Sequence, residues 1–218
     1  MEACRLVEIG TRKTTDCTVR MKTMGKVTSN SIEPKDLQGN ESSARKDTQI
    51  DFCPRSDASE SRITFALITC SDTRDETQDT AGAALKERIA QKGWECLSYC
   101  MVKDDREEIA KAIAQAADNP DIDVVLTCGG TGLSPRDVTP EATRDVCDRE
   151  VPGIAEGMRA YSLNITPRTM LSRAVCMQRG STLVINLPGS KKAVCENWDG
   201  VVEVLPHAVS MMAGCGHA

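Results

Sequence analysis

Several residue types and patterns that mark common classes of protein are scarce or missing in this sequence. Aromatic residues make up only 3% of the 218 residues, so the core has to be built from Ala, Val, Leu and Ile. The two histidines, His207 and His217, both lie near the C-terminus, which makes a histidine-based zinc site or a Ser-His-Asp triad hard to assemble. The sequence has no run of 18 apolar residues, so no membrane span is predicted, and the first residues lack the apolar segment of a signal peptide. Carboxylates, hydroxyls and backbone groups are left to carry any chemistry.

Charge and cysteine content indicate a cytoplasmic protein that binds neither nucleic acid nor membrane. The formal net charge of -5 offers no electrostatic attraction for either polyanion. The 11 cysteines are odd in number, and none forms a C-x-x-C pair. Cys70, Cys128 and Cys176 lie in or beside apolar runs, where free cysteine behaves as a small hydrophobic residue. We therefore expect reduced thiols in the cytosol in preference to a disulfide framework.

The chain changes character near Arg62. Residues 1–62 are rich in Ser, Thr, Lys, Arg, Asp and Glu, and segment 29–51 has almost no apolar periodicity. Such a segment buries too little apolar surface to offset its ordering entropy, which predicts a polar, disordered extension. The short stretches 6–9 and 17–27 are the alternative, as strands that dock on the main domain. That domain is expected over residues 63–218.

Short apolar runs alternate with helical patterns from residue 63 onward. Strands are predicted at 63–69, 95–102, 121–127 and 182–187. Helices are predicted at 79–92, 104–118, from 139, at 191–198 and 201–212, with the segments near 153–163 and 169–174 helical or mixed. This alternation predicts an α/β sandwich with a mainly parallel sheet, in which ligands bind beyond the carboxyl ends of the strands.

A glycine-rich turn follows the third predicted strand. Its sequence, Gly129-Gly130-Thr131-Gly132, matches neither G-x-G-x-x-G nor a P-loop. Three glycines in four residues still permit positive φ and close backbone approach, and their N–H groups are suited to an anion nest. The alternative is a tight turn without a ligand.

Acidic residues and an arginine follow the strands as well. Arg136 and Asp137 come just after the glycines, and nucleotidyl transfer requires donors for phosphate oxygens and a carboxylate for Mg²⁺. Asp137 could instead cap a turn before the helix that starts at Thr139-Pro140 with a capping hydroxyl. Asp104 follows the second strand, and with Glu107 it matches a capping box, the favoured role by position alone.

The other strand ends carry polar residues too. Ser71-Asp72 follows the first strand, and after the fourth strand Asn186 can face a ligand while Pro188 and Gly189 fix a turn. Ser172-Arg173 precedes the fourth strand and is suited to phosphate, although each dipeptide alone is common on surfaces.

Taken together, five separated motifs resemble, in order and spacing, the bacterial MogA/MoaB family and the G domains of plant Cnx1 and animal gephyrin. The motifs are Ser71-Asp72, residues 129–132, residues 136–143, Ser172-Arg173 and residues 186–189. The resemblance covers about residues 63–212 and leaves residues 1–62 unplaced. It implies a three-layer α/β molybdopterin-binding domain, usually trimeric, that transfers AMP from ATP to the terminal phosphate of molybdopterin. The products would be adenylyl-molybdopterin and pyrophosphate.

The resemblance also implies a role for each matching residue. Asp104 and Asp137 fall on the aspartates that the family needs for Mg²⁺-ATP chemistry. The residues expected to bind nucleotide, phosphate or pterin are Ser71, Asp72, Asp79, Gly82, Gly129, Gly130, Thr131, Gly132, Arg136, Ser172, Arg173, Asn186, Pro188 and Gly189. Positioning and electrostatic stabilisation would supply most of the catalysis, without a protein nucleophile.

One departure and three alternatives accompany this interpretation. Ala81 stands where family members usually carry serine, which would weaken one contact. A domain that binds molybdopterin without turnover is the first alternative. A scaffold that uses residues 1–62 to dock partners is the second, and a generic α/β phosphate-binding protein is the third. No molybdate-inserting module follows, so that step would belong to another protein.

Overall fold

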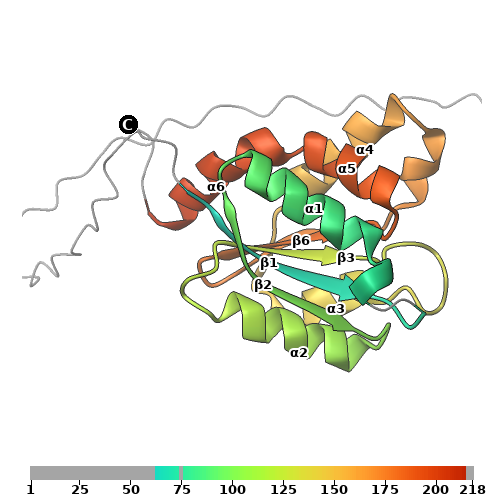
Figure 1. Ribbon diagram of the computed structural model, residues 1–218, viewed down its shortest axis with the longest axis horizontal. Helices are drawn as coiled ribbons and strands as arrows, with labels where there is room; N and C mark the ends of the chain where they lie inside the picture. The colour runs from blue at the N-terminus through green and yellow to red at the C-terminus, as the bar shows by residue number, and fades with distance from the viewer. Residues whose placement is uncertain (1–61, 74–75, 215–218) are drawn as a thin grey trace, which may run out of the picture. The chain divides into compact units, whose positions relative to one another are not determined.

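The computed structural model describes residues 62–73 and 76–214, which form a sheet covered by helices on both faces (Figure 1). The predictions for residues 1–61, including the candidate strands at 6–9 and 17–27, lie outside the described residues. Within the described ranges, no helix is long and apolar enough to span a bilayer.

Six strands form one sheet in the order β2-β1-β3-β6-β5-β4. They are β1 (Thr64–Cys70), β2 (Glu95–Val102), β3 (Val124–Cys128), β4 (Arg149–Glu150), β5 (Cys176–Arg179) and β6 (Thr182–Leu187). Strands β2, β1, β3 and β6 are parallel, whereas β5 pairs antiparallel with β6 and β4 antiparallel with β5. The predicted α/β class with a mainly parallel sheet is confirmed. The two short strands β4 and β5 escaped prediction because two and four residues are too few to establish a period.

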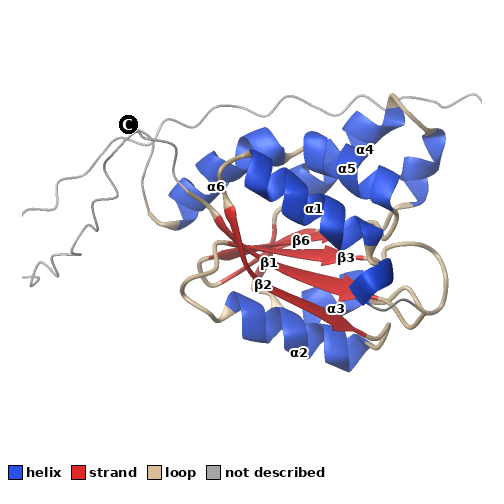
Figure 2. Cartoon of the chain, viewed as in Figure 1, coloured by secondary structure: helices blue, strands red, loops and turns tan. Residues whose placement is uncertain are grey.

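In the described part of the chain, six α-helices and three 3₁₀-helices connect the strands (Figure 2). The α-helices are α1 (Thr80–Gln91), α2 (Arg106–Ala117), α3 (Thr139–Val146), α4 (Pro152–Leu163), α5 (Lys191–Asp199) and α6 (Leu205–Met212). The 3₁₀-helices are η1 (Glu76–Gln78), η2 (Pro167–Leu171) and η3 (Val202–Val204). Helix α1 ends as predicted, since Gly93 follows its C-cap with a φ of 73° that a residue with a Cβ rarely adopts.

One face of the sheet packs on α1, α4, α5 and α6 (Figure 1). Alternate residues of β1, Phe65 and Leu67, point into this layer and meet Leu85 of α1. Phe65 also contacts Trp94 and Trp198, with ring centroids 5.7 and 5.9 Å apart. Three of the six aromatic residues are therefore concentrated at one point of one core.

The opposite face packs on α2 and α3 (Figure 1). Ala66, Ile68 and Cys70 of β1 point into this second layer, where they meet Ile109 and Ile113 of α2. Burial raises the pKa of the Cys70 thiol to about 12, so the thiol stays protonated and apolar. The prediction that Cys70, Cys128 and Cys176 are buried is confirmed, with exposed fractions of 2%, 0% and 0%.

The parallel arrangement brings the carboxyl ends of four strands to one edge. β2, β1, β3 and β6 end at Val102, Cys70, Cys128 and Leu187. The loops that follow carry the predicted site residues 71–72, 104, 129–137 and 188–189. Topology thus gathers segments that are far apart in the chain, as ligand sites in open α/β sheets require.

Candidate functional site

The glycine loop, residues 129–132, turns back over the end of β3. Gly129 and Gly130 have φ values of 109° and 65°, in the left-handed region that favours glycine. A Cβ on Gly129 would lie 2.5 Å from the carbonyl oxygen of Cys70, and a Cβ on Gly130 would lie 2.2 Å from Oγ1 of Thr139. Glycine is therefore required at both positions by conformation and by space.

All four carbonyl groups of the glycine loop accept hydrogen bonds from only two residues. Thr139 donates from Oγ1 to the Gly129 oxygen at 2.9 Å and from its backbone N–H to the Gly130 oxygen at 3.2 Å. Arg173 donates from its backbone N–H to the Thr131 oxygen at 2.9 Å and from Nε to the Gly132 oxygen at 2.7 Å. The carbonyl dipoles are thus directed toward the protein.

The N–H groups of the same loop, unlike its carbonyl groups, mostly lack partners among the described residues. Gly129 donates to the Leu187 oxygen at 3.0 Å, but no described residue accepts from the N–H of Gly130, Thr131 or Gly132. Three successive N–H donors beside positive-φ glycines are the components of an anion nest. The alternative of a turn without a ligand would leave these three N–H groups to bind water.

Thr139 and Asn186 belong to a buried network below the glycine loop. Asn186 donates from Nδ2 to Thr127 at 3.0 Å and to Thr143 at 2.9 Å, and Thr143 donates to the Thr139 carbonyl at 2.8 Å. All four side chains are 0% exposed. The expectation that Asn186 faces a ligand is therefore wrong, because its amide is used inside the protein. The expected capping hydroxyl of Thr139 is also wrong, since Val138 is the N-cap and Thr139 bonds the loop instead.

Arg173 holds the loop as well. Besides its bonds to residues 131 and 132, its guanidinium pairs with Glu141 and donates to the Asp137 carbonyl. Burial works to raise the pKa of Glu141, but the bonds from Arg173 outweigh it and hold that pKa below its ordinary 4.5. Every nitrogen of the Arg173 guanidinium has a partner in the protein, so Arg173 positions the glycine loop, and its expected role in phosphate recognition stays a prediction.

The acidic residues lie on three neighbouring strand ends. Asp72 and Asp104 bind each other's backbone: the Asp72 carboxylate accepts from the Asp104 N–H at 3.1 Å, and the reverse bond is 3.2 Å. Arg136 forms an ion pair with Asp72, and Asp137 accepts from the Ser134 N–H at 2.8 Å. The expected capping box is wrong, because Asp105 caps α2 by accepting from the N–H groups of Glu107 and Glu108. Asp104 is thereby left for another role.

Asp79 has a structural role that its sequence position did not reveal. It is 4% exposed, caps α1 by accepting from the Gly82 N–H, and accepts from Thr69 at 2.6 Å and Tyr99 at 2.9 Å. Burial acts to raise its pKa, yet these hydrogen bonds keep the pKa below the ordinary value. Ala81, where a serine was expected, is 0% exposed, so a hydroxyl there would not reach the strand-end surface directly.

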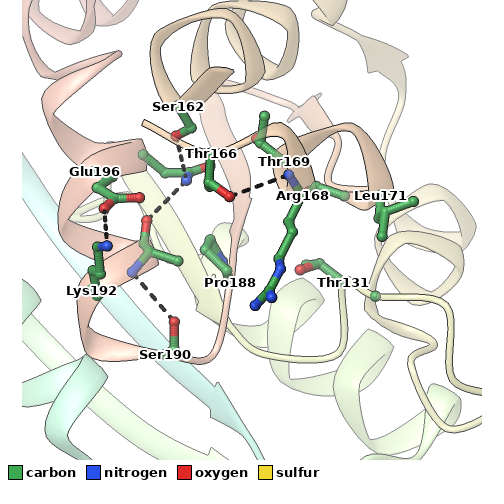
Figure 3. A pocket seen from close by; sticks show the side chains of 14 residues that line it. Thr131, Ser162, Thr166, Arg168, Thr169, Leu171, Pro188, Ser190, Lys192 and Glu196 are labelled. Atoms are coloured by element: carbon green, nitrogen blue, oxygen red, sulfur yellow. Dashed lines mark hydrogen bonds and ion pairs between the residues drawn. The ribbon is translucent and has the colours of Figure 1, made fainter. Parts of the chain in front are cut away.

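A cavity of about 420 Å³ opens beside the glycine loop (Figure 3). Thr131, Gly132, Ser172 and Pro188, four of the predicted site residues, line one side of it. The remaining lining comes from α4, η2 and the first turns of α5, and consists of Ser162, Thr166, Arg168, Thr169, Leu171, Ser190, Lys192, Ala193, Glu196 and Asn197.

Two cations of this cavity were missed by sequence reasoning. Arg168 of η2 extends across the cavity toward Pro188 and Thr131, and Lys192 lies at the start of α5 near Ser190 (Figure 3). Lys192 also lies 3.8 Å from Glu196. Both cations are single exposed residues in segments with no diagnostic motif. The only available signal was their closeness in sequence to the Ser172-Arg173 and 186–189 motifs.

The donor set at the strand ends suits a hard divalent cation completed by a ligand. Asp104 and Asp137 supply carboxylate oxygens, and Mg²⁺ is commonly held by one or two carboxylates plus substrate phosphates and water. No group of three His, Cys, Asp or Glu side chains within residues 62–73 and 76–214 forms a metal site by itself.

Fold and site together define a three-layer α/β domain with a glycine-rich loop and a cavity at the strand ends. Residues 66–207 match the family described as "probable molybdopterin binding domain", and the chain belongs to this family. The resemblance deduced from the five motifs is thereby confirmed.

Particular relatives agree with this assignment. The molybdopterin adenylyltransferase of Helicobacter pylori strain J99 is 35% identical over 156 residues, which are 70% of this chain and 89% of that protein. The molybdenum cofactor synthesis protein cinnamon of Drosophila melanogaster is 38% identical over 69% of this chain, but the match spans only 26% of cinnamon. The crystal structure of the molybdopterin biosynthesis enzyme MoaB from Thermus thermophilus superposes with a TM-score of 0.65 at 47% identity, covering 70% of this chain and 97% of that one.

Proposed function

We propose that this protein is a molybdopterin adenylyltransferase of molybdenum cofactor biosynthesis, acting in the cytoplasm as a homotrimer. It transfers AMP from Mg²⁺-bound ATP to the terminal phosphate of molybdopterin. The observation that carries the proposal is the hydrogen bonding of the glycine loop. Its carbonyl groups are all bound, whereas its N–H groups at residues 130–132 have no acceptor among the described residues. In this proposal those N–H groups bind phosphate oxygens. Similarity to a molybdopterin adenylyltransferase over 89% of that protein supports the choice of substrates.

The reaction is a displacement at phosphorus. An oxygen of the molybdopterin phosphate forms a bond to the α-phosphorus of ATP, and the bond from that phosphorus to the bridging β-oxygen breaks. Pyrophosphate departs with the electron pair, leaving adenylyl-molybdopterin. The N–H groups of Gly130, Thr131 and Gly132 bind phosphate oxygens as charge moves onto pyrophosphate, and fixed donors of this kind need little reorganisation.

The strand-end acids hold the cation of the nucleotide. Asp137 and Asp104 are its ligands in this proposal, and Mg²⁺ when bound neutralises negative charge on the phosphate oxygens. Arg136, whose side chain is 62% exposed and paired with Asp72, is next to Asp137 in the sequence and would contact the nucleotide phosphates in this proposal.

The cavity accounts for the second substrate. Arg168 and Lys192 bring positive charge to it, Ser172 and Thr166 bring hydroxyls, and Leu171 adds an apolar wall. A pterin with a phosphate arm needs a surface for a flat ring and cationic donors for the phosphate. Thr131 and Gly132 belong to the cavity lining, which supports the proposal that the pterin phosphate binds next to the glycine loop.

Pyrophosphate release from ATP, molybdopterin and Mg²⁺ tests the proposal, with Asp137→Asn compared with the wild type. We expect turnover by the wild type and a loss of about 100-fold or more in the variant, as for other preorganised charge-stabilising groups. Asp121→Asn is the matched control, because Asp121 lies in the exposed turn before β3, at the opposite edge of the sheet. Tight molybdopterin binding without pyrophosphate release would instead establish the non-catalytic carrier.

The trimer is a separate part of the proposal and has a test of its own. Light scattering of the purified protein at micromolar concentration should give three times the mass of the 23.6 kDa chain. A monomeric mass would remove the trimer and leave the proposed chemistry in place.

A further inference from the structure

We propose that Thr139, Thr143 and Asn186 are positioning residues that set the phosphate affinity of the glycine loop from beneath it. This inference rests on the proposed function, because it assumes that the loop binds phosphate. None of the three side chains reaches the surface, since each is 0% exposed. Their effect on a ligand must therefore pass through the backbone of residues 129 and 130.

The hydrogen bonds form one continuous chain from the sheet to the loop. Asn186 of β6 stands beside Thr127 of β3 in register and donates to it at 3.0 Å. The second amide hydrogen goes to Thr143 of α3 at 2.9 Å, and Thr143 donates in turn to the Thr139 carbonyl at 2.8 Å. Thr139 then donates to the Gly129 carbonyl at 2.9 Å. The link between the last two bonds is Thr139 itself, whose carbonyl accepts from Thr143 and whose hydroxyl donates to Gly129.

The last bond decides which way the loop faces. A peptide unit is planar, so a carbonyl that points into the protein directs the N–H of the next residue the opposite way. Bonding of the Gly129 and Gly130 oxygens to Thr139 therefore directs the N–H groups of Gly130 and Thr131 away from α3. Without these bonds, the two glycines have many other conformations available, because positive φ costs glycine little.

The amide of Asn186 is suited to this network. It has two donor hydrogens and one carbonyl oxygen, and Oδ1 accepts from the Val175 N–H at 3.4 Å while Nδ2 serves the two threonines. A buried polar group in an apolar layer is costly unless it is bonded, and here the oxygen and both amide hydrogens of Asn186 are bonded. A fully bonded network of this kind holds its members in one arrangement, and its last member, Thr139, binds the glycine loop.

Inorganic pyrophosphate is the probe, titrated calorimetrically into the full-length chain in the presence of Mg²⁺. We expect Thr139→Val, which keeps the shape and removes the hydroxyl, to weaken pyrophosphate binding about tenfold, equivalent to ~1.4 kcal/mol. Thr139→Ser restores the hydroxyl and should bind within about twofold of the wild type.

Thr182→Val is the matched control. Thr182 is 1% exposed and its hydroxyl bonds to the carbonyl oxygens of Ala117 and Ile122, both at 3.0 Å, at the opposite edge of the sheet. Its loss should lower the melting temperature of the protein and leave pyrophosphate affinity within about twofold. Equal weakening by Thr139→Val and Thr182→Val would reduce the network to a stabilising role and overturn the inference.

The remaining outcomes also decide between the claims. Thr139→Val with wild-type affinity, or a wild type that does not bind pyrophosphate, overturns the inference. A wild type that binds pyrophosphate but releases none from ATP and molybdopterin overturns the proposed function and leaves the inference standing. If Thr139→Val does not fold, Thr143→Val takes its place, with about threefold weaker binding expected one bond further from the loop. Unchanged affinity in Thr143→Val would then overturn the inference.

Discussion

The two faces of the sheet are packed with different kinds of side chain. The face under α1, α4, α5 and α6 holds Phe65, Trp94 and Trp198, whose ring centroids lie within 6.2 Å of one another. The face under α2 and α3 has a smaller aliphatic core, and toward the strand ends it gives way to the network around Asn186. Apolar packing is non-directional, whereas hydrogen bonds fix orientation. The comparison teaches that one face supplies most of the stability and the other orients the loop.

The largest effect should come from the aromatic face. Trp198→Ala removes a side chain that is 2% exposed, and truncation of this kind costs about 3–5 kcal/mol of the free energy of unfolding. Urea denaturation measures the loss, and pyrophosphate affinity of the folded variant should stay within about twofold. A loss below about 1 kcal/mol would contradict the division between the two faces.

The next effect separates orientation from stability on the α2/α3 face. Asn186→Leu leaves the Val175 N–H without its side-chain acceptor and should cost about 1–3 kcal/mol, together with a several-fold loss of pyrophosphate affinity. Ile113→Ala in the same layer should cost about 2–5 kcal/mol without altering affinity. If Asn186→Leu and Ile113→Ala both lost pyrophosphate affinity in proportion to their loss of unfolding free energy, orientation and stability would not be separable on this face.

A smaller effect is expected at the cavity. Arg168→Ala removes an exposed cation, so the free energy of unfolding should change by less than about 0.5 kcal/mol. Molybdopterin affinity should fall about tenfold, because a hydrogen bond from a charged group contributes about 1.5–3 kcal/mol. Arg149→Ala, an exposed arginine of β4, is the control and should bind normally. Fluorescence titration with molybdopterin distinguishes the two variants, and equal affinities would exclude Arg168 from the site.

The smallest effect is a dependence on pH. The Glu141 carboxyl has a folded-state pKa below its ordinary 4.5, so its stabilising contribution is complete above that value and is lost as pH falls through the folded pKa. The free-energy difference between wild type and Glu141→Gln should be constant near neutrality and vanish in acid. It should be small, because the Arg173 and Glu141 side chains are 35% and 33% exposed. If the free-energy difference between wild type and Glu141→Gln grew on acidification, the pKa of Glu141 would not be lowered in the folded state.

Much of the architecture could be predicted because its signals are local. The apolar run before Gly129 marks β3, and Gly93 marks the end of α1, so neighbouring residues carry the information. The shared edge at the carboxyl ends of the strands follows from the parallel connections, whereas the order β2-β1-β3-β6-β5-β4 needed the structure. The two-residue β4 has no such signal, since its place is set by pairing with β5.

The sequence indicated which residues gather at the strand ends, but not which contacts each of them makes. Arg173 and Gly132 are 41 residues apart, and no sequence pattern reveals that one donates to the other's carbonyl. Asp104 and Asp105 are adjacent acids, and only the path of the chain assigns the cap to Asp105. The catalytic and ligand-binding roles of the site residues remain predictions that the variants above test.

The peptide bond between Ser172 and Arg173 links the cavity to the glycine loop. Ser172 lines the cavity, and the next residue, Arg173, holds the glycine loop. Consecutive Cα atoms across a trans peptide lie about 3.8 Å apart, a separation that packing cannot stretch. The cavity wall at Ser172 and the loop-binding residue Arg173 are therefore joined by a single rigid peptide unit, so a displacement of one is transmitted directly to the other.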